Sequence, residues 1–583
     1  MNRSLRERAS KADSIVEMLR IHAEESGDSA AYVVYDTMGE EKGRITFSEL
    51  WQKSSAIASA LSASGVAPQS PVLLLLDQGL DFILAYYACL MGRFIAVPSN
   101  PPRANRKSER ILRIAEHCQP ACIITNSVLS ARLIGAMGET SLPVLLVEDL
   151  ADHPSVLPNG MPSGKDLALL QYTSGSTGNP RGVMVSHINL AWNIFSRINR
   201  LGYAFCDESG PTSFASWLPV FHDMGLIGSV MDPACLGTPC HLSTPTTFIQ
   251  RPWTWLKIIS DQKVRAAGGP DFGFKLCTEQ ANTMPKLELG AWTVAWNGAE
   301  PIQYRSFLKF GETFEAQGFN VKALLPSYGL AEATLMASGR APGEPLEAMH
   351  LDRRELQAGK VVPSTGPDSA SIVNCGRALD GHRLLIVDPE TLEELPALTI
   401  GEIWFHGLSV AAGYWKEPDL TRETFEAETR QGFGPCLRTG DLGFLDANGH
   451  LYITGRRKDL IIVRGANHLP QDIEATVEAA HHSINPTGVA AFAVETLAGE
   501  EVGILAEIKR TSLKTLDAQE VFHAIRARVA RTHGVHVHRI GLIKPMSLPK
   551  TTSGKVQRSA CRKALTESGI ELVSEFVEER KEG

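Results

Sequence analysis

A run of hydroxyl and glycine residues is the part of this sequence whose residue types most directly indicate chemistry. The run begins at Thr173 and follows residues 167–172, a continuous apolar stretch with the length of a buried strand. Backbone N–H groups and hydroxyls that gather after a strand can surround a polyphosphate. The spacing here, and also at Gly554-Lys555-Val556, does not fit the Gly-x4-Gly-Lys-Ser/Thr pattern of a Walker loop. A short run of these residue types is more often a flexible loop. The alternative is a phosphate-binding loop of another kind, made by Thr173, Ser174, Gly175, Ser176, Thr177 and Gly178.

Five further motifs follow this loop in order and extend over most of the remaining chain. They are Trp296-Asn297-Gly298-Ala299-Glu300-Pro301, Ser327-Tyr328-Gly329-Leu330-Ala331-Glu332, Arg438-Thr439-Gly440-Asp441, Gly455-Arg456-Arg457-Lys458-Asp459 and the basic segment of residues 549–558. With the loop sequence YTSGSTGNPRG of residues 172–182, this ordered set resembles the adenylate-forming superfamily of acyl-CoA synthetases, nonribosomal adenylation domains and luciferases. Six motifs in one order leave little room for chance.

The resemblance implies a role for each motif. It implies that ATP and Mg²⁺ are the cofactors, with Glu332 as the metal ligand and Lys555 as the catalytic lysine. Asp441 would bind both ribose hydroxyls, Arg456 would lie near the ribose, and Asp459 would belong to the hinge between two domains. The adenine site would be formed by Gly298, Ala299, Glu300, Ser327, Tyr328, Gly329 and Ala331, with the tyrosine packed on adenine.

These residue types suit the chemistry that the resemblance implies. A carboxylate that attacks the α-phosphate of ATP is an anion approaching an anion, so positive charge is needed where the oxygens crowd. Lys555 is a mobile point charge that could bridge the substrate carboxylate and the α-phosphate. Magnesium prefers oxygen ligands and binds through one or two carboxylates plus phosphates, which suits a single Glu332. The hydroxyls of the loop would hold the leaving pyrophosphate.

Each of these residues, taken alone, also has an ordinary structural interpretation. A lone glutamate after a Tyr-Gly turn is usually a surface charge, a lysine in a polar tail is usually solvated, and Asp441 alone would more often be a turn residue. Their shared order favours the functional interpretation. His222, in the segment FHDMG, is a core group in one interpretation and a catalytic candidate in the other, because the resemblance places it at the acyl site. His533, His536 and His538 are expected on the surface, since nothing else converges on them.

Departures from the common acyl-CoA synthetase pattern resemble one subfamily, the fatty acyl-AMP ligases. Ala331 stands where acyl-CoA synthetases usually have threonine, and a long stretch with a polar centre separates Glu332 from Gly376. The NGAEP turn, FHDMG and the segment NHLPQDIE of residues 467–474 belong to the same resemblance. It implies an insertion near residues 346–367. It also implies acyl transfer to the phosphopantetheine of a holo acyl carrier protein, or of a polyketide or nonribosomal peptide synthase carrier domain, rather than to free CoA. We expect the carrier to be a separate protein.

Length and composition limit the classes of protein to which the chain can belong. At 583 residues it is too long for one compact core, so two or more domains are expected. The net charge of -8 argues against nucleic-acid binding, which needs a concentrated basic face. The most apolar stretch, residues 71–98, is interrupted by charges such as Asp77 and Arg93, so no membrane span is expected. No secretion signal is visible, and ten cysteines are scattered without a CxxC pair, which favours reduced thiols in the cytoplasm.

The order of apolar segments predicts an α/β fold. Before about residue 375, apolar runs of strand length alternate with amphipathic helical patterns, which is typical of buried parallel strands joined by crossover helices. Residues 376–458 are rich in β-formers and turn signals and are expected to form a barrel-like antiparallel subdomain. We place the domain boundary at Lys458-Asp459. Residues 1–458 would then form an adenylation domain of parallel sheets flanked by helices, and residues 459–583 a small mobile α+β lid domain.

The predicted function is ATP-dependent activation of a fatty acid to fatty acyl-AMP with release of pyrophosphate, followed by acyl transfer to a carrier protein. The second hypothesis is a long-chain fatty acyl-CoA ligase with an unusual insertion. The third is a nucleotide-binding regulator without catalysis, which the retention of both Glu332 and Lys555 disfavours. Acyl chain length and the identity of the carrier do not follow from the sequence, because both depend on how distant side chains pack.

Overall fold

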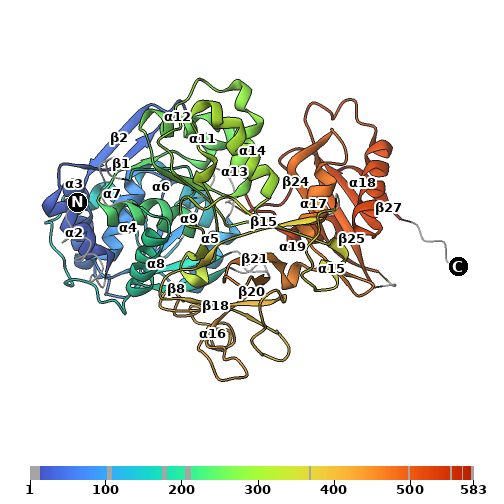
Figure 1. Cartoon of the computed structure of the whole chain (residues 1–583). Coiled ribbons are helices and arrows are strands. Elements are labelled where there is room, and N and C mark those ends of the chain that lie inside the picture. Colours follow the sequence, from blue (N-terminus) through green and yellow to red (C-terminus); the bar gives the residue numbers. More distant parts are fainter. Residues whose placement is uncertain are drawn as a thin grey trace.

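Two β-sheets form the centre of the N-terminal part of the chain, and helices pack around them (Figure 1). The computed structural model describes residues 14–101, 108–138, 140–173, 180–203, 212–366, 369–496, 499–551, 554–567 and 569–578. The first sheet has the order β6-β5-β3-β4-β7-β8, with all neighbours parallel except β7 and β8. Its strands are β3 (Pro71–Leu75), β4 (Ile95–Ser99), β5 (Cys122–Thr125), β6 (Val144–Leu146), β7 (Leu167–Thr173) and β8 (Arg181–Ser186). The predicted parallel strands are confirmed at the continuous apolar runs. Side chains of β3, β4 and β5 are buried along the whole strand, as expected for strands covered on both faces, whereas β6 at the edge is partly exposed.

The second sheet contains nine strands in the order β17-β14-β13-β12-β11-β9-β10-β1-β2. Its central strands are parallel, and β2, β14 and β17 pair antiparallel near the two edges. The strands are β1 (Ala30–Tyr35), β2 (Glu41–Thr46), β9 (Phe214–Ser216), β10 (Cys240–Leu242), β11 (Ala266–Gly269), β12 (Val294–Asn297), β13 (Leu324–Gly329), β14 (Met336–Gly339) and β17 (Arg377–Ala378). Parallel pairing of β12 with β13 brings the ends of these two strands, and therefore two of the six motifs, side by side.

The helices begin where the sequence supplies caps. Helix α8 (His187–Arg200) starts with a capping box, in which the Ser186 hydroxyl accepts from the Asn189 N–H and Asn189 Oδ1 accepts from the Ser186 N–H. Asn189 also donates to the carbonyls of Leu408 and Val410 at 2.8 and 2.9 Å, which fixes α8 against a distant segment. Other helices of this part are α2 (Ile15–Glu25), α3 (Phe47–Ala63), α4 (Leu80–Met91), α5 (Glu109–Cys118), α6 (Ser127–Met137), α7 (Val147–Leu150), α11 (Pro245–Gln250), α12 (Trp253–Asp261), α13 (Asp271–Glu279), α14 (Tyr304–Phe314) and α16 (Pro418–Phe425).

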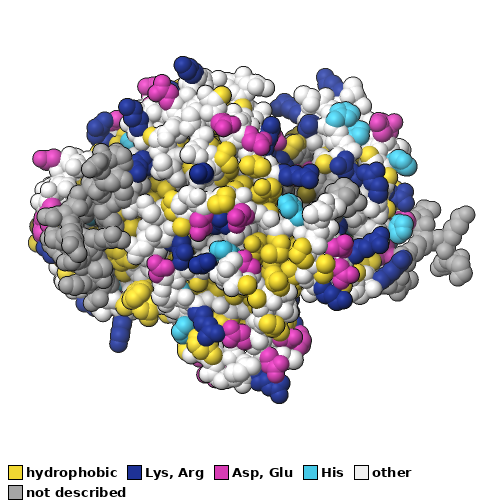
Figure 2. Space-filling view, in the orientation of Figure 1, with side chains coloured by type: hydrophobic (Ala, Val, Ile, Leu, Met, Phe, Trp, Pro, Cys, Tyr) yellow, Lys and Arg dark blue, Asp and Glu magenta, His cyan; other side chains and the backbone are white. Residues whose placement is uncertain are grey.

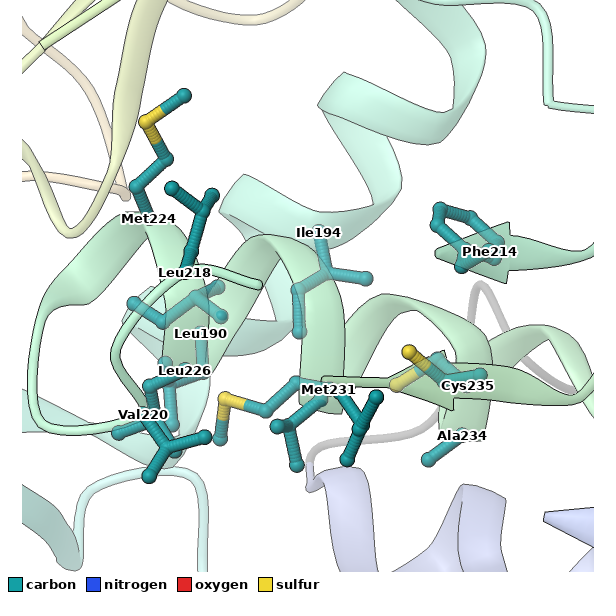
Figure 3. Close-up of a cluster of buried hydrophobic side chains, with 14 of the residues drawn as sticks. Leu190, Ile194, Phe214, Leu218, Val220, Met224, Leu226, Met231, Ala234 and Cys235 are labelled. Carbon is teal, nitrogen blue, oxygen red and sulfur yellow. The ribbon is translucent and has the colours of Figure 1, made fainter. Parts of the chain in front are cut away.

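Helices α9 (Asp223–Leu226) and α10 (Asp232–Leu236) are joined by a π-helical turn, η1 (Ile227–Met231), into one continuous helical segment. Its apolar side chains pack against α8 and β9, and Figure 3 shows Leu190, Ile194, Phe214, Met231, Ala234 and Cys235 among the members of this cluster. Single π-helical turns are rare and often occur at functional sites. This segment also lines the cavity of the candidate active site.

The predicted barrel-like subdomain contains a four-stranded antiparallel sheet in the order β18-β19-β20-β21. The strands are β18 (Arg383–Val387), β19 (Gly401–His406), β20 (Leu437–Leu445) and β21 (Leu451–Arg456). Within the described residues this sheet does not close into a barrel. A two-stranded ribbon of β15 (Ala348–Leu351) and β16 (Ala370–Val373), with the short helix α15 (Arg353–Gln357) between its strands, lies within and beside the predicted insertion.

The C-terminal part has a hydrophobic core of its own, separate from the core of the N-terminal part. A four-stranded sheet, β24-β25-β26-β27, is covered by helices, and a two-stranded ribbon precedes it. The elements are β22 (Ile461–Val463), β23 (Ala466–His468), α17 (Pro470–Glu478), β24 (Ile484–Thr496), β25 (Gly499–Ile508), α18 (Ala518–His533), β26 (Val537–Ile543), α19 (Arg558–Thr566) and β27 (Leu572–Val577). This mixture of helices and a mostly antiparallel sheet confirms the predicted α+β class.

The contact between the two parts is charged as well as apolar. Arg353 of α15 forms an ion pair with Asp472 of α17, and Lys275 of α13 pairs with Glu478 at 2.5 Å. Gln357 of α15 lies 3.2 Å from His468 Nδ1 and donates to the carbonyl of His533 at 3.4 Å. Figure 2 shows charged, histidine and hydrophobic side chains together along this border. The insertion thus contacts three elements of the C-terminal part.

None of the helices within the described ranges combines the length and the apolar character that a membrane crossing requires.

Candidate active site

One cavity of about 1590 Å³ lies between the N-terminal and C-terminal parts and is lined by both. It brings together every described residue that the sequence analysis assigned to the site. These residues are Thr173, His222, Gly298, Ala299, Glu300, Ser327, Tyr328, Gly329, Ala331, Glu332, Asp441, Arg456, Asp459 and Lys555. Groups that are hundreds of residues apart in sequence therefore share one space, as a single multi-part site requires.

The predicted phosphate loop connects β7 and β8. Thr173, the last residue of β7, pairs with Arg181, the first residue of β8, and both line the cavity. Ser174, Gly175, Ser176, Thr177 and Gly178 lie outside the described residues. The two strands therefore anchor the ends of the loop at the cavity wall.

The predicted adenine turn follows β12. Ala299 has a φ of 72°, and a Cβ on Gly298 would lie 2.8 Å from Ser327 Oγ, so the close approach of this turn to β13 requires glycine. The Ser327 hydroxyl donates to the carbonyl of Asn297 at 3.0 Å, which ties the two strand ends together. Glu300 accepts from the N–H of Phe272 at 2.7 Å, and burial raises the pKa of this carboxyl.

Tyr328, Asp441 and Arg456 form a hydrogen-bonded chain. The Tyr328 hydroxyl donates to Asp441 Oδ2 at 2.7 Å, and Arg456 Nε donates to Asp441 Oδ1 at 2.9 Å. Asp441 raises the pKa of Arg456, while burial raises the pKa of Tyr328 well above its ordinary value. Each carboxylate oxygen has a second lone pair, so Asp441 can still accept hydrogen bonds from a diol. The chain holds this carboxylate in one orientation.

Glu332 lies just after β13, the strand that contains Tyr328, in the short helix η5 (Ala331–Ala333). Its Oε1 accepts from the Tyr414 hydroxyl at 2.8 Å, and within the described part of the chain its Oε2 accepts no hydrogen bond. Arg181 lies over the Tyr414 ring, 5.6 Å from its centroid, which links this carboxylate to the phosphate loop. One oriented carboxylate with an open oxygen beside a phosphate loop fits the donor set that magnesium prefers.

Lys555 projects into the cavity from the C-terminal part. Its backbone N–H donates to Thr551 Oγ1 at 3.0 Å and its carbonyl accepts from the Thr551 N–H at 2.7 Å, which closes a tight turn. Burial lowers the pKa of the lysine, whereas the carboxylates of Asp223, Glu300 and Asp441 raise it. A buried cation of this kind can stabilise an anionic group that binds beside it, because the attraction between opposite charges offsets the cost of removing both from water.

His222 and Asp223 stand together at the start of α9. His222 Nδ1 lies 2.5 Å from Asp223 Oδ1, and both residues line the cavity. Burial raises the pKa of Asp223, but His222 and Lys555 lower it, and the net pKa is below its ordinary value. Asp223 in turn raises the pKa of Lys555, as expected for opposite charges that share one cavity.

The predicted hinge residue is engaged with the C-terminal part. Asp459 Oδ2 accepts from Arg558 Nη1 at 3.1 Å. Arg558 also donates twice to Glu474, at 2.7 and 2.8 Å, so one guanidinium joins the hinge to helix α17. Bidentate pairs of this kind are geometrically specific. The hinge is therefore fixed in this arrangement by a contact within the C-terminal part.

Sequence reasoning missed several residues that the structure places at the site, namely Asp223, Tyr414 and Arg558. Asp223 belongs to the segment FHDMG, and Arg558 ends the basic segment of residues 549–558. A charged residue within a recognised motif was the sequence signal that could have identified both. Tyr414 had none, because its partner Glu332 is 82 residues away. The expectation that His533 lies on the surface was wrong, since this side chain is only 5 % exposed.

Comparison with known protein families and structures gives concordant results. Residues 19–415 match the family described as AMP-binding enzyme, and residues 458–575 match the AMP domain of Disco-interacting protein 2-like proteins. A medium-chain-fatty-acid–[acyl-carrier-protein] ligase, JamA, from Moorena producens is 36% identical, with 96% of each chain covered. The long-chain-fatty-acid–AMP ligase FadD26 from Mycobacterium marinum is 34% identical, with 94% of this chain and 96% of the relative covered.

A solved structure agrees with these sequence relatives. The fatty acyl-adenylate ligase from L. pneumophila, in complex with acyl adenylate and pyrophosphate, is similar with a TM-score of 0.74 and 33% identity. The similarity covers 98% of this chain and 99% of that one. The superfamily resemblance carried by the six motifs is thereby confirmed, and the chain belongs to the AMP-binding enzyme family.

Proposed function

We propose that this enzyme is a fatty acyl-AMP ligase, which activates a fatty acid with ATP and passes the acyl group to an acyl carrier protein. The observation that carries the proposal is the convergence of Lys555, Glu332 and the Tyr328–Asp441–Arg456 chain on one cavity. The relatives named above support the same substrate and acceptor, because one is named as a fatty-acid–[acyl-carrier-protein] ligase and the other as a fatty-acid–AMP ligase.

In the proposed binding mode, adenine lies between the turn after β12 and Tyr328, and Asp441 accepts from both ribose hydroxyls. The closeness of Gly298 to Ser327 supports this placement, since it keeps the turn flat against β13. Thr173 and Arg181, at the ends of the proposed phosphate loop, pair with each other and line the same cavity, which supports binding of the triphosphate there. Backbone N–H groups and hydroxyls there would hold the pyrophosphate as it leaves.

In the first half-reaction, a carboxylate oxygen of the fatty acid attacks the α-phosphorus, a new C–O–P linkage forms, and the bond to pyrophosphate breaks. Lys555 lies among Asp223, Glu300 and Asp441, so its positive charge is positioned where the two anions meet. His222, held by Asp223, would border the carboxyl end of the fatty acid. Preorganised charge of this kind is usually a large contributor to catalysis.

We propose Mg²⁺ as the metal, with Glu332 as its protein ligand. The support is the chemistry of the donor set, because Tyr414 orients the carboxylate and leaves one oxygen open toward the cavity. When bound, the ion would neutralise phosphate charge. No protein residue other than Glu332 is assigned to it here.

In the second half-reaction, the thiol of a phosphopantetheine arm attacks the acyl carbon, loses its proton, and displaces AMP to form a thioester. Lys555 would then have to leave, and the C-terminal domain would rotate about a hinge at Asp459. Support for a boundary at Lys458-Asp459 comes from the separate core that begins after it and from the second family match, which begins at residue 458. The domains proposed are therefore residues 1–458 and 459–583.

We also propose a cytoplasmic location. ATP and carrier proteins are available there, and the nine described cysteines are all buried free thiols, as is usual in a reducing compartment.

One pair of assays tests the proposed function. Purified enzyme with ATP, Mg²⁺ and a fatty acid should release pyrophosphate and form acyl-AMP. Addition of a holo acyl carrier protein should then give an acyl thioester, whereas addition of free CoA should give almost none. Efficient acyl-CoA formation would instead establish the acyl-CoA ligase alternative, and no pyrophosphate release with any fatty acid would exclude both.

A further inference from the structure

A buried charged pair lines the same cavity. Arg197 of helix α8 donates through Nη2 to Oδ1 of Asp232, the first residue of α10. The two side chains are 3 % and 0 % exposed, and both line the cavity. Neither residue belongs to any of the six motifs. The proposed reaction at Lys555 therefore does not explain this pair.

The position of Asp232 places the pair deep along the acyl side. In the proposed binding mode, His222 and Asp223 mark the reactive end, because both line the cavity together with Lys555 and the opposite charges of Asp223 and Lys555 shift each other's pKa. Met224, Gly228 and Asp232 all line the cavity at intervals of four residues along the continuous segment α9–η1–α10. At 1.5 Å per residue, Asp232 lies on the order of 10 Å beyond Met224. A chain bound by its carboxyl group near Lys555 would run along this face toward the pair.

The space between the two ends is suited to an alkyl chain. Gly228 presents no side chain, and a Cβ there would already lie 3.6 Å from Leu335 Cδ2. Leu335, Met336 and Leu201 line the same cavity. Figure 3 shows Met224 pointing away from the buried cluster of Val220 and Leu226. The wall between Met224 and Asp232 is therefore apolar, and the charged pair interrupts it.

The pair has hydrogen-bonding capacity that no described residue uses. Nε and Nη1 of Arg197 and Oδ2 of Asp232 are buried and have no partner in the described part of the chain. Buried donors and acceptors are nearly always paired, because an unpaired one loses its hydration without compensation. The guanidinium of Arg558 is better satisfied than that of Arg197, since its Nε, Nη1 and Nη2 all donate to carboxylates. A ligand group that both accepts and donates would complete the Arg197–Asp232 pair.

We propose that the Arg197–Asp232 pair binds a hydroxyl group on the acyl chain, so that hydroxylated fatty acids are the preferred substrate class. A hydroxyl can accept from the open N–H groups of Arg197 and donate to Oδ2 of Asp232. A second carboxylate would be repelled by Asp232, an ammonium group would be repelled by Arg197, and a methyl group would leave both unpaired. The inference rests on the proposed function, because it assumes that the cavity holds the acyl chain of an adenylation substrate.

The test compares adenylation of saturated fatty acids with that of matched fatty acids that carry one hydroxyl at successive positions along the chain. The readout is kcat/KM for pyrophosphate release. Hydrogen bonds to charged groups predict a preference of roughly ten- to a hundredfold for the hydroxyl position that reaches the pair. The preference should peak at one region of the chain, because the pair is fixed in depth.

Variants assign the preference to the pair. The double variant Arg197→Met, Asp232→Leu removes both charges with similar volume, which avoids a single unpaired buried charge. In this variant, the ratio of kcat/KM for the hydroxylated fatty acid to kcat/KM for the plain one should fall to about one or below. The matched control is Arg340→Met, which removes a guanidinium that is also 3 % exposed but does not line the cavity. This control should keep the wild-type ratio of the two kcat/KM values.

A measurement on the wild-type protein alone covers the case in which the double variant does not fold. Non-hydrolysable acyl-adenylate analogues with and without the hydroxyl should differ in Kd by the same factor as the substrates differ in kcat/KM. Efficient adenylation of plain fatty acids with no preference at any hydroxyl position would overturn this inference and leave the proposed function standing. No pyrophosphate release with either class would overturn the proposed function, and this inference with it.

Discussion

Two of the contacts between the C-terminal domain and the N-terminal part differ in their chemistry. The Lys555 turn enters the cavity, where carboxylates of the N-terminal part surround the lysine and burial lowers its pKa. Helix α15 contacts the C-terminal domain through Arg353–Asp472 and through Gln357, and no residue of that contact belongs to the predicted ATP site. The proposed second half-reaction requires the first contact to break. We propose that the second contact resists that rotation, which would control the position of the domain separately from the chemistry.

The largest expected effect comes from the Lys555 contact. Lys555→Ala should lower the rate of acyl-adenylate formation by about 10²–10³, because the two reacting anions lose the charge between them. Transfer from preformed acyl-adenylate should fall much less, since the lysine has withdrawn by then. Pyrophosphate release and thioester formation measure the two steps. Lys563→Ala, at an exposed position on α19, is the control, and adenylation within a few-fold of wild type in Lys555→Ala would show that the lysine is misassigned.

A smaller effect is expected at the hinge. Asp459→Pro should spare adenylation and slow transfer by about tenfold or more, because proline fixes one backbone dihedral where two domain orientations need different values. Asp459→Asn, which keeps the backbone free but weakens the bond from Arg558, should affect transfer less. Equal losses in both half-reactions would indicate misfolding, and unchanged transfer would place the hinge elsewhere.

The contact of α15 can be broken without touching the cavity residues that hold ATP. Deletion of residues 353–364 should preserve adenylation and produce some acyl-CoA where the wild type makes almost none, since a freed domain can populate other orientations. Arg353→Ala should act in the same direction but more weakly, and Arg354→Ala, exposed on the same helix, should have no effect. The measurement is acyl-CoA formed per acyl-adenylate at matched folded fraction. A folded, adenylating deletion without this gain would refute the restraint by the insertion.

The smallest effect is a pH dependence of the same contact. Burial lowers the pKa of His533 to about 3 and that of His468 to about 4, from an ordinary 6.5. The unfolded state therefore binds more protons below about pH 6.5, so these groups stabilise the fold fully above that pH and progressively less as the pH falls toward 4. His533→Gln should flatten this decline by up to ~1.4 kcal/mol per pH unit, measured by denaturant unfolding. His523→Gln, exposed on the same helix, is the control, and identical slopes in all three proteins would contradict the prediction.

Much of the fold and site could be predicted because the signals are local. The apolar run of residues 167–172 predicted β7, and the alternation of apolar runs with helical patterns predicted parallel strands joined by helices. The motifs that carry the candidate site follow strands or turns, so their hydroxyls, glycines and charges are visible as short strings. The resemblance of six such strings in order implied roles for them around one ATP, and their described site residues line one cavity. Secondary structure and short motifs depend on neighbours within a few residues in the sequence, and sequence patterns can detect features over that range.

Other properties of the protein were decided only by the tertiary structure. Arg197 pairs with Asp232 because α8 packs against the segment α9–η1–α10, and Arg353 meets Asp472 across 119 residues because the insertion lies on the C-terminal domain. His533 is buried, although its sequence surroundings predicted exposure, and its Nε2 lies 2.8 Å from the Thr476 hydroxyl of α17, 57 residues away. The physical reason is that the free energy of a buried charge or histidine depends on which groups surround it in space. Those groups come from elements whose approach is set by packing of the whole core, and no local pattern encodes them.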